Sequence, residues 1–172
     1  MTGDAPYRAW WFDQALRHER APDPAPLRGE LEVDVCIVCG GYTGLWTAIL
    51  IKQTDPDRKV VVVEQELCGH GASGANGGCM LTLATKYLSL IRFYGEGEAA
   101  RLVQASEQAV AEIHDFAQTH GIECDLRLDG ALYMATNQAQ VGVMDSVLRA
   151  LDKSGINSWE EMTPPQAAAI AG

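Results

Sequence analysis

Two glycines and one glutamate near the start of the chain have the types and spacing that can hold a pyrophosphate and a ribose. Gly41 and Gly44 stand at the second and third glycine positions of a G-x-G-x-x-G pattern. In such a pattern one glycine lets the backbone approach the phosphates, and the next lets a helix pack closely on its strand. Glu64 follows Gly44 by twenty residues, where a carboxylate can accept the hydroxyl protons of an adenosine ribose. The pattern predicts a dinucleotide site.

The elements around these residues are those that such a site needs. Apolar runs at residues 33–38 and 59–64 predict two strands, and residues 42–53 predict a helix between them. Because the helix begins beside the glycines, its free N–H groups and the positive end of its dipole point toward the anion. The strand–helix–strand order predicts an α/β fold with a Rossmann-like unit.

Cys39 occupies the first glycine position of the pattern. A side chain in this tight turn costs about 1–3 kcal/mol if the backbone conformation is one that only glycine tolerates. We expect the turn to form and the dinucleotide affinity to be weakened. Cys36 and Cys39 also form a C-x-x-C string, but no second cysteine pair has zinc-site spacing. No metal site is predicted.

A glycine-rich segment, residues 67–78, follows Glu64 and suits neither a helix nor a strand. Together with residues 40–48 it resembles the signatures of the D-amino-acid-oxidase-like FAD-dependent oxidoreductases, which include glycine, sarcosine and γ-glutamylputrescine oxidases. The resemblance implies a Rossmann-like FAD-binding βαβ domain with FAD as cofactor. The family often has an arginine where this chain has Ala75, so one cation near the cofactor or substrate is missing.

The resemblance implies roles for the matched residues. The residues expected at the FAD pyrophosphate are Gly40, Gly41, Tyr42, Thr43 and Gly44. Glu64 is expected on the adenosine ribose. The residues expected to extend toward the flavin are Gly71, Ala72, Ser73, Asn76, Gly77 and Gly78. The implied reaction is oxidation of the C–N bond of a small-molecule amine or amino acid, with hydride transfer to flavin and dioxygen as acceptor. No catalytic residue is predicted.

Two other interpretations stay open. The Rossmann fingerprint also serves NAD, so the chain is alternatively an NAD-binding module, although such a module does not require residues 71–78. Alternatively, Cys39 and Ala75 together with a missing C-terminal half abolish FAD retention, which makes the chain a noncatalytic truncated remnant or a partner-dependent subunit. His70 lies within the glycine-rich segment and is either a cofactor contact or a solvated loop residue.

The 172 residues are short for this resemblance, because the family builds its nucleotide-binding domain from both ends of a chain more than twice as long. The chain is therefore expected to be an N-terminal fragment that needs a missing C-terminal half or a partner chain. Residues 1–30 read as an aromatic arm and a proline-rich linker, with Trp10, Trp11 and Phe12 in an amphipathic segment that packs on the domain or docks a partner or membrane surface. Residues 31–94 read as the first part of the FAD-binding domain.

Residues 95–172 read as the truncated start of an α+β substrate domain. Helical periodicity predicts a helix over residues 96–120, and Asp129-Gly130 between two short apolar runs predicts a hairpin. A further helix is predicted to end at Gly155, with Ile156 sealing it as in a Schellman motif. Residues 163–166 have the sequence of a capping box at the start of another helix.

Composition narrows the class of protein. The formal net charge of −10 argues against nucleic acid and anionic membrane surfaces as partners. No apolar run approaches the ~18 residues of a membrane span, and the start of the chain lacks the apolar core of a secretory signal. Five cysteines are an odd number without the spacing of a disulfide framework. A cytoplasmic protein without a membrane span is expected.

Overall fold

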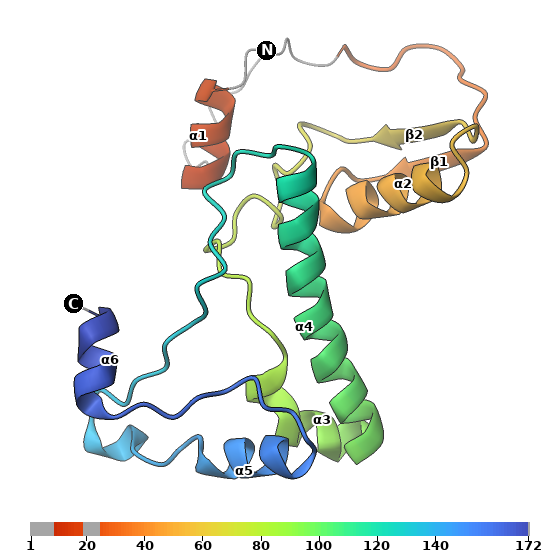
Figure 1. The fold of residues 1–172 in the computed structure, drawn as a ribbon. Helices are drawn as coiled ribbons and strands as arrows, with labels where there is room; N and C mark the ends of the chain where they lie inside the picture. The colour runs from red at the N-terminus through yellow and green to blue at the C-terminus, as the bar shows by residue number, and fades with distance from the viewer. Residues whose placement is uncertain (1–8, 19–24, 172) are drawn as a thin grey trace. The chain divides into compact units, whose positions relative to one another are not determined.

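The structure is a computed structural model that describes residues 9–18 and 25–171 (Figure 1). The chain divides into two compact units, residues 1–79 and 80–172. The division into an arm, a cofactor domain and a substrate domain stays a prediction, and much of the arm and its linker lies outside the described residues. None of the described helices is long and apolar enough to cross a membrane.

The first unit contains the predicted strand–helix–strand order. Strand β1 (Val35–Val38) and strand β2 (Val60–Val63) are parallel, and their register pairs Val35 with Val60. Helix α2 (Tyr42–Thr54) connects them. The valine runs explain the strands, since β-branched side chains favour the pleated backbone. This unit also includes helix α1 (Trp10–His18).

Helix α2 ends at Thr54, one residue beyond the predicted range of 42–53. The N–H of Asp55 donates to the carbonyl of Ile51, and the Asp55 carboxylate accepts a hydrogen bond of 2.8 Å from Nε of Arg58. Lys52 in the last turn of the helix donates through Nζ to the carbonyl oxygen of Arg58 at 2.9 Å. These contacts lead the chain from α2 into β2. The α/β fold class of this unit agrees with the prediction.

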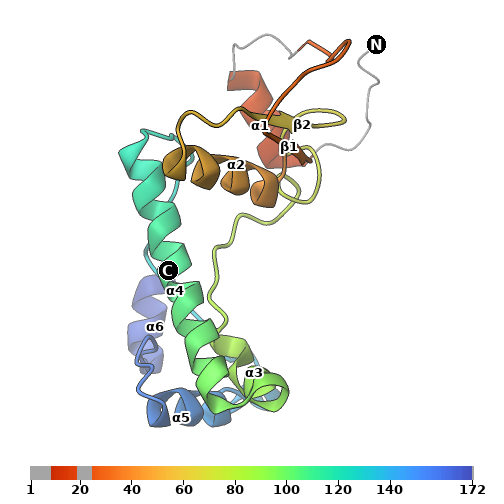
Figure 2. The same cartoon turned by 90° about the vertical axis from the view of Figure 1, so that its right-hand side faces the viewer.

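The second unit consists of helices and irregular segments. It contains the short 3₁₀ helices η1 (Ala84–Lys86) and η2 (Gln138–Gln140) and the α-helices α3 (Tyr87–Tyr94), α4 (Glu96–Thr119), α5 (Asp145–Lys153) and α6 (Pro164–Ala171). Helix α3 packs against α4 and α5 (Figure 2). Buried residues of these three helices, of η1 and of the segment after α5 form one apolar core: Ala84, Tyr87, Ala99, Val103, Val147, Leu151 and Ile156.

The helix ends in this unit follow the local sequence. The N–H of Ile156 donates to Leu151 O at 3.0 Å, and that of Gly155, at φ +73°, donates to Asp152 O at 2.9 Å. This is the predicted Schellman motif, and Ile156 is buried beside Leu151. At the start of α6, Gln166 Oε1 accepts a hydrogen bond of 2.9 Å from the N–H of Thr163, as the capping box predicts.

The prediction of a hairpin around Asp129-Gly130 is wrong, because this segment contains no strand. No strand is assigned between Met80 and Ala171, so the second unit does not show the α+β composition that was expected. Gly130 has φ +88°, but Asp129 does not have the positive φ that a two-residue Asp-Gly hairpin turn also requires. Two strands alone are marginal without a further strand or a helix to pack on. The apolar side chains of this segment are instead exposed, Tyr133 by 47% and Met134 by 51%.

Candidate dinucleotide-binding site

The turn between β1 and α2 is tied to the second strand. The N–H of Cys39 donates to Val63 O at 2.8 Å, which extends the parallel ladder by one bond. Cys39 itself has φ +96°, a conformation that favours glycine. The N–H of the next residue, Gly40, donates to Glu64 Oε2 at 2.7 Å. Cys39 therefore holds the turn conformation for which the pattern normally uses glycine, as the sequence indicated.

The two pattern glycines are places where no side chain fits. A Cβ on Gly44 would lie 2.0 Å from the carbonyl oxygen of Cys39 and 3.3 Å from Cγ2 of Ile37, so its absence lets α2 lie on β1. A Cβ on Gly41 would lie 2.9 Å from Ser73 Oγ. Gly44 thus allows the close helix packing that a pyrophosphate cradle requires, and at Gly41 the backbone is approached by Ser73 Oγ.

Glu64 lies directly after β2 and is fixed by backbone donors. Its Oε2 accepts from the N–H of Gly40, and its Oε1 accepts from the N–H of Gln65 at 2.8 Å and from that of Glu66 at 3.3 Å. These hydrogen bonds, the one from Gly40 foremost, lower the pKa of the Glu64 carboxyl below its usual value. Glu64 is therefore a carboxylate held beside the turn, and the side chain of Cys39 also hydrogen-bonds to it.

The glycine-rich segment, residues 67–78, folds onto the same turn. The N–H of Gly69 donates to Gly40 O at 3.0 Å, and the N–H of Tyr42 donates to Ser73 Oγ at 3.0 Å. The side chain of Asn76 donates from Nδ2 to Tyr42 Oη at 3.3 Å. The structure thus brings the two predicted groups of cofactor residues together at the N-terminal end of α2.

The same segment shows features suited to a phosphate or a sugar chain. The N-cap of α2 is a glycine without a side-chain cap, so the hydroxyl of Ser73 serves the first N–H of the helix from outside. A Cβ on Gly71 or on Gly77 would meet no atom within 4 Å, which leaves open space beside the backbone. The dipole of α2 and this open backbone fit an anionic dinucleotide.

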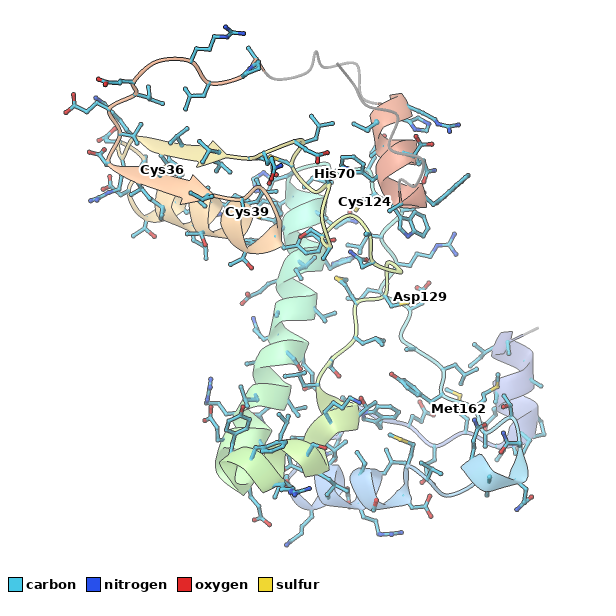
Figure 3. All side chains as sticks on the ribbon, turned by 180° about the vertical axis from the view of Figure 1, so that it is seen from behind. Cys36, Cys39, His70, Cys124, Asp129 and Met162 are labelled. Carbon is cyan, nitrogen blue, oxygen red and sulfur yellow. The ribbon has the colours of Figure 1, made fainter. Side chains whose placement is uncertain are left out.

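The remaining predicted residues lie at the surface of this site. Thr43 and Ala72 are exposed, and so is Gly78, whose φ is +76°. His70 pairs with Glu66, with 3.1 Å between Nε2 and Oε2, and its ring meets the edge of Phe12 with 5.5 Å between centroids. Whether each predicted residue binds cofactor stays a prediction; Figure 3 labels Cys39 of the turn and His70 of the glycine-rich segment, both in the first unit.

Two contacts at the site were not anticipated from the sequence. Cys68 packs under the turn, because a Cβ on Gly40 would lie 2.5 Å from its Sγ. Phe12 of α1 reaches the glycine-rich segment, although it lies far away in the sequence. The only local signal for Phe12 was its place in an aromatic run. Within residues 9–18 and 25–171, no group of three or more histidine, cysteine or acidic residues is arranged to hold a metal ion.

Comparison with curated proteins identifies relatives. The chain is 33% identical to gamma-glutamylputrescine oxidoreductase of Escherichia coli over 135 residues, which are 78% of this chain and 31% of that protein. It is 27% identical to the probable oxidoreductase OrdL of Haemophilus influenzae over 78% of this chain and 30% of the relative. The OrdL protein of Rhizobium meliloti is 31% identical over 67% of this chain and 26% of its own length. The chain thus spans under a third of these relatives.

The family comparison covers most of the chain, including the whole candidate site. No solved structure matches the chain significantly. The family model described as "DAO: FAD dependent oxidoreductase" matches residues 34–172. That range contains the turn, Glu64 and the glycine-rich segment. The chain therefore belongs to the family of DAO-like FAD-dependent oxidoreductases, and its cofactor is FAD.

Proposed function

We propose that this chain provides the first part of the FAD site of an oxidoreductase that oxidises the C–N bond of a small-molecule amine or amino acid. The observation that carries the proposal is the meeting of the turn, Glu64 and the glycine-rich segment at one end of α2. The name of the Escherichia coli relative, gamma-glutamylputrescine oxidoreductase, supports an amine-containing substrate. Dioxygen is proposed as the electron acceptor.

The residues of this chain then have separate tasks toward FAD. The backbone from Gly40 to Gly44 and the N-terminal end of α2 bind the pyrophosphate, because donors and the helix dipole favour an anion there. Glu64, as a carboxylate, accepts hydrogen bonds from the hydroxyl groups of the adenosine ribose. The stretch from Gly71 to Gly78 leads toward the flavin. When bound, FAD supplies the hydride acceptor for the reaction.

The catalytic residues are proposed to come from outside residues 1–172, from a C-terminal part or from a partner chain. The coverage of under a third of the relatives' length supports this view. A noncatalytic remnant that retains no FAD is the main alternative. An NAD-binding module is weaker as an alternative, because the family that the chain matches uses FAD.

The test measures whether the purified protein retains flavin and which compounds reduce that flavin. Flavin absorbance that persists through desalting, and that is bleached under anaerobic conditions by γ-glutamylputrescine or by other amines and amino acids, is the expected result. Retained flavin that none of these compounds reduces would contradict the proposed substrate class. Loss of all flavin on desalting, together with no binding in an FAD titration, would favour the noncatalytic remnant. Quenching of tryptophan fluorescence by NADH but not by FAD would favour the NAD-binding module.

A further inference from the structure

Helix α1 lies on the glycine-rich segment, and two neighbouring aromatic side chains make the contact. Carbons of the Phe12 ring lie 3.3 Å from the Cβ position of Gly74 and 3.9 Å from that of Gly69. The indole of Trp11 lies 3.6 Å from the Cβ position of Gly78. Phe12 and Trp11 thus contact residues at both the beginning and the end of the segment.

His70 adds a contact to the Phe12 ring. The two rings are 5.5 Å apart between centroids at 77°, an edge-to-face arrangement, which aromatic rings favour. His70 is also paired with Glu66 through its Nε2. Figure 3 shows His70 on the segment close to α1. Phe12 therefore meets both backbone and side chain of the segment.

The contacts that the segment makes within itself are all short-range, so they leave its path as a whole to be fixed from outside. Its internal backbone hydrogen bonds close short turns, such as Gly74 N–H to Gly71 O at 3.1 Å, and the side chain of Asn76 bonds Ser73 O and the N–H of Gly78. Gly69 and Gly78 have positive φ and many other backbone conformations open to them. Ordering a chain of this kind costs conformational entropy at every residue. Contacts from both sides, the turn on one and α1 on the other, offset that cost.

Gly74 shows that the segment and α1 are fitted to each other. A Cβ at this position would lie 2.3 Å from Gly69 O as well as 3.3 Å from the Phe12 ring. The absence of a side chain at Gly74 thus serves the fold of the segment and the approach of Phe12. This glycine was not among the predicted cofactor residues, and its contacts give it a separate reason to be glycine.

We propose that α1 is a strap that holds residues 67–78 in the conformation that binds FAD, with Phe12 as the positioning residue and Trp11 as its second contact. The proposal rests on the proposed assignment of this segment to FAD. Phe12 acts through the segment. When only a fraction of the protein has the binding conformation, the apparent dissociation constant rises by the inverse of that fraction. By reciprocity, bound FAD also favours the docked state of α1.

The matched control lies on the same helix. Trp10 is 69% exposed and forms none of the contacts described above, so Trp10→Ala removes an aromatic residue from α1 without touching the segment. A helix of nine residues is marginal alone in water, so α1 needs its docking contacts to stay folded. Phe12→Leu serves as a rescue variant, because it keeps an apolar side chain at the contact.

The experiment compares the wild type with Phe12→Ala, Phe12→Leu and Trp10→Ala in the complete protein chain. Hydrogen exchange without cofactor measures the order of residues 67–78, and titration with FAD measures affinity. Phe12→Ala is expected to speed exchange in the segment and to weaken FAD binding about three- to tenfold. Phe12→Leu is expected to restore part of both, and Trp10→Ala to change neither. Added FAD is expected to slow exchange within α1 of the wild type.

The outcomes separate the strap from the proposed function. Unchanged exchange in Phe12→Ala overturns the strap, and faster exchange with unchanged FAD affinity overturns its link to FAD. An equal effect of Trp10→Ala overturns the role of Phe12 as well. If the wild type binds no FAD, the proposed function fails and the link between α1 and FAD fails with it. Hydrogen exchange of the variants without cofactor still decides whether α1 orders the segment.

Discussion

Replacing Cys39 by glycine should stabilise the first unit. Cys39 has φ +96°, and a non-glycine residue held in a sparsely populated backbone region costs about 1–3 kcal/mol. Glycine removes that strain but gives the unfolded chain more freedom, which costs about 0.4–1 kcal/mol. The net gain in the free energy of unfolding is therefore about 0.5–2 kcal/mol. If the turn relaxes when FAD is absent, the same energy appears as FAD affinity, at about tenfold for each 1.4 kcal/mol.

The matched control is Cys39→Ala, which removes the thiol and keeps the Cβ. Its backbone strain should equal that of the wild type, so any gain specific to glycine reports conformation and not the loss of sulfur. Hydrogen exchange of the β1 and β2 amides follows the unfolding of the first unit, and FAD titration follows binding. A Cys39→Gly protein that is no more stable than Cys39→Ala, and binds FAD no more tightly, would refute the strain argument.

Four further outcomes are expected. Glu64→Gln should weaken FAD and ADP binding by up to about a hundredfold and leave FMN unaffected, because FMN lacks the adenosine ribose; calorimetric titration measures all three. The pKa of Glu64 is held low in the fold, so Glu64 stabilises the folded state at pH values above the usual glutamate pKa. This contribution is lost as the pH falls through the lowered pKa. The Glu64→Gln variant should therefore lack that acid step in denaturation curves. Gly44→Ala should destabilise the first unit by about 1–3 kcal/mol, because the added Cβ would clash with Cys39 O. Hydrogen exchange of the β1 and β2 amides measures this loss. Gly71→Ala, where the added Cβ meets open space, should leave the stability unchanged. Leu151→Ala should cost about 2–5 kcal/mol of unfolding free energy in urea denaturation, because Leu151 is 1% exposed in the core of the second unit.

Local signals were sufficient to predict the frame of the site. The valine runs, the glycine pattern and Glu64 predicted β1, α2 and β2 because each depends on residues close in the sequence. The cap at Gly155 and the Thr163–Gln166 bond were predicted for the same reason. Short-range hydrogen bonds and turn conformations are the features that a sequence encodes most directly.

What the sequence did not predict depends on distant partners. At the predicted hairpin Gly130 has positive φ but Asp129 does not, and a pair of strands needs further packing that its own residues cannot provide. The contact of Phe12 with Gly74 joins segments that are far apart in the sequence. Helix α3 was also missed, although the burial of Tyr87 against α4 and α5 explains its place. Periodicity reports which face is apolar and leaves the partner of that face open.

The turn tolerates cysteine because its surroundings determine its conformation more strongly than its own residue does. Hydrogen bonds from the N–H groups of Cys39 and Gly40 hold it to Val63 and Glu64. Strained conformations persist where neighbouring structure fixes them in this way. Glu64 consequently has two tasks, since the carboxylate proposed for ribose also holds the turn that is proposed for pyrophosphate. Loss of the turn alone would weaken every phosphate-containing flavin, so an effect of Glu64→Gln on FAD and ADP that spares FMN is the result that isolates the ribose contact.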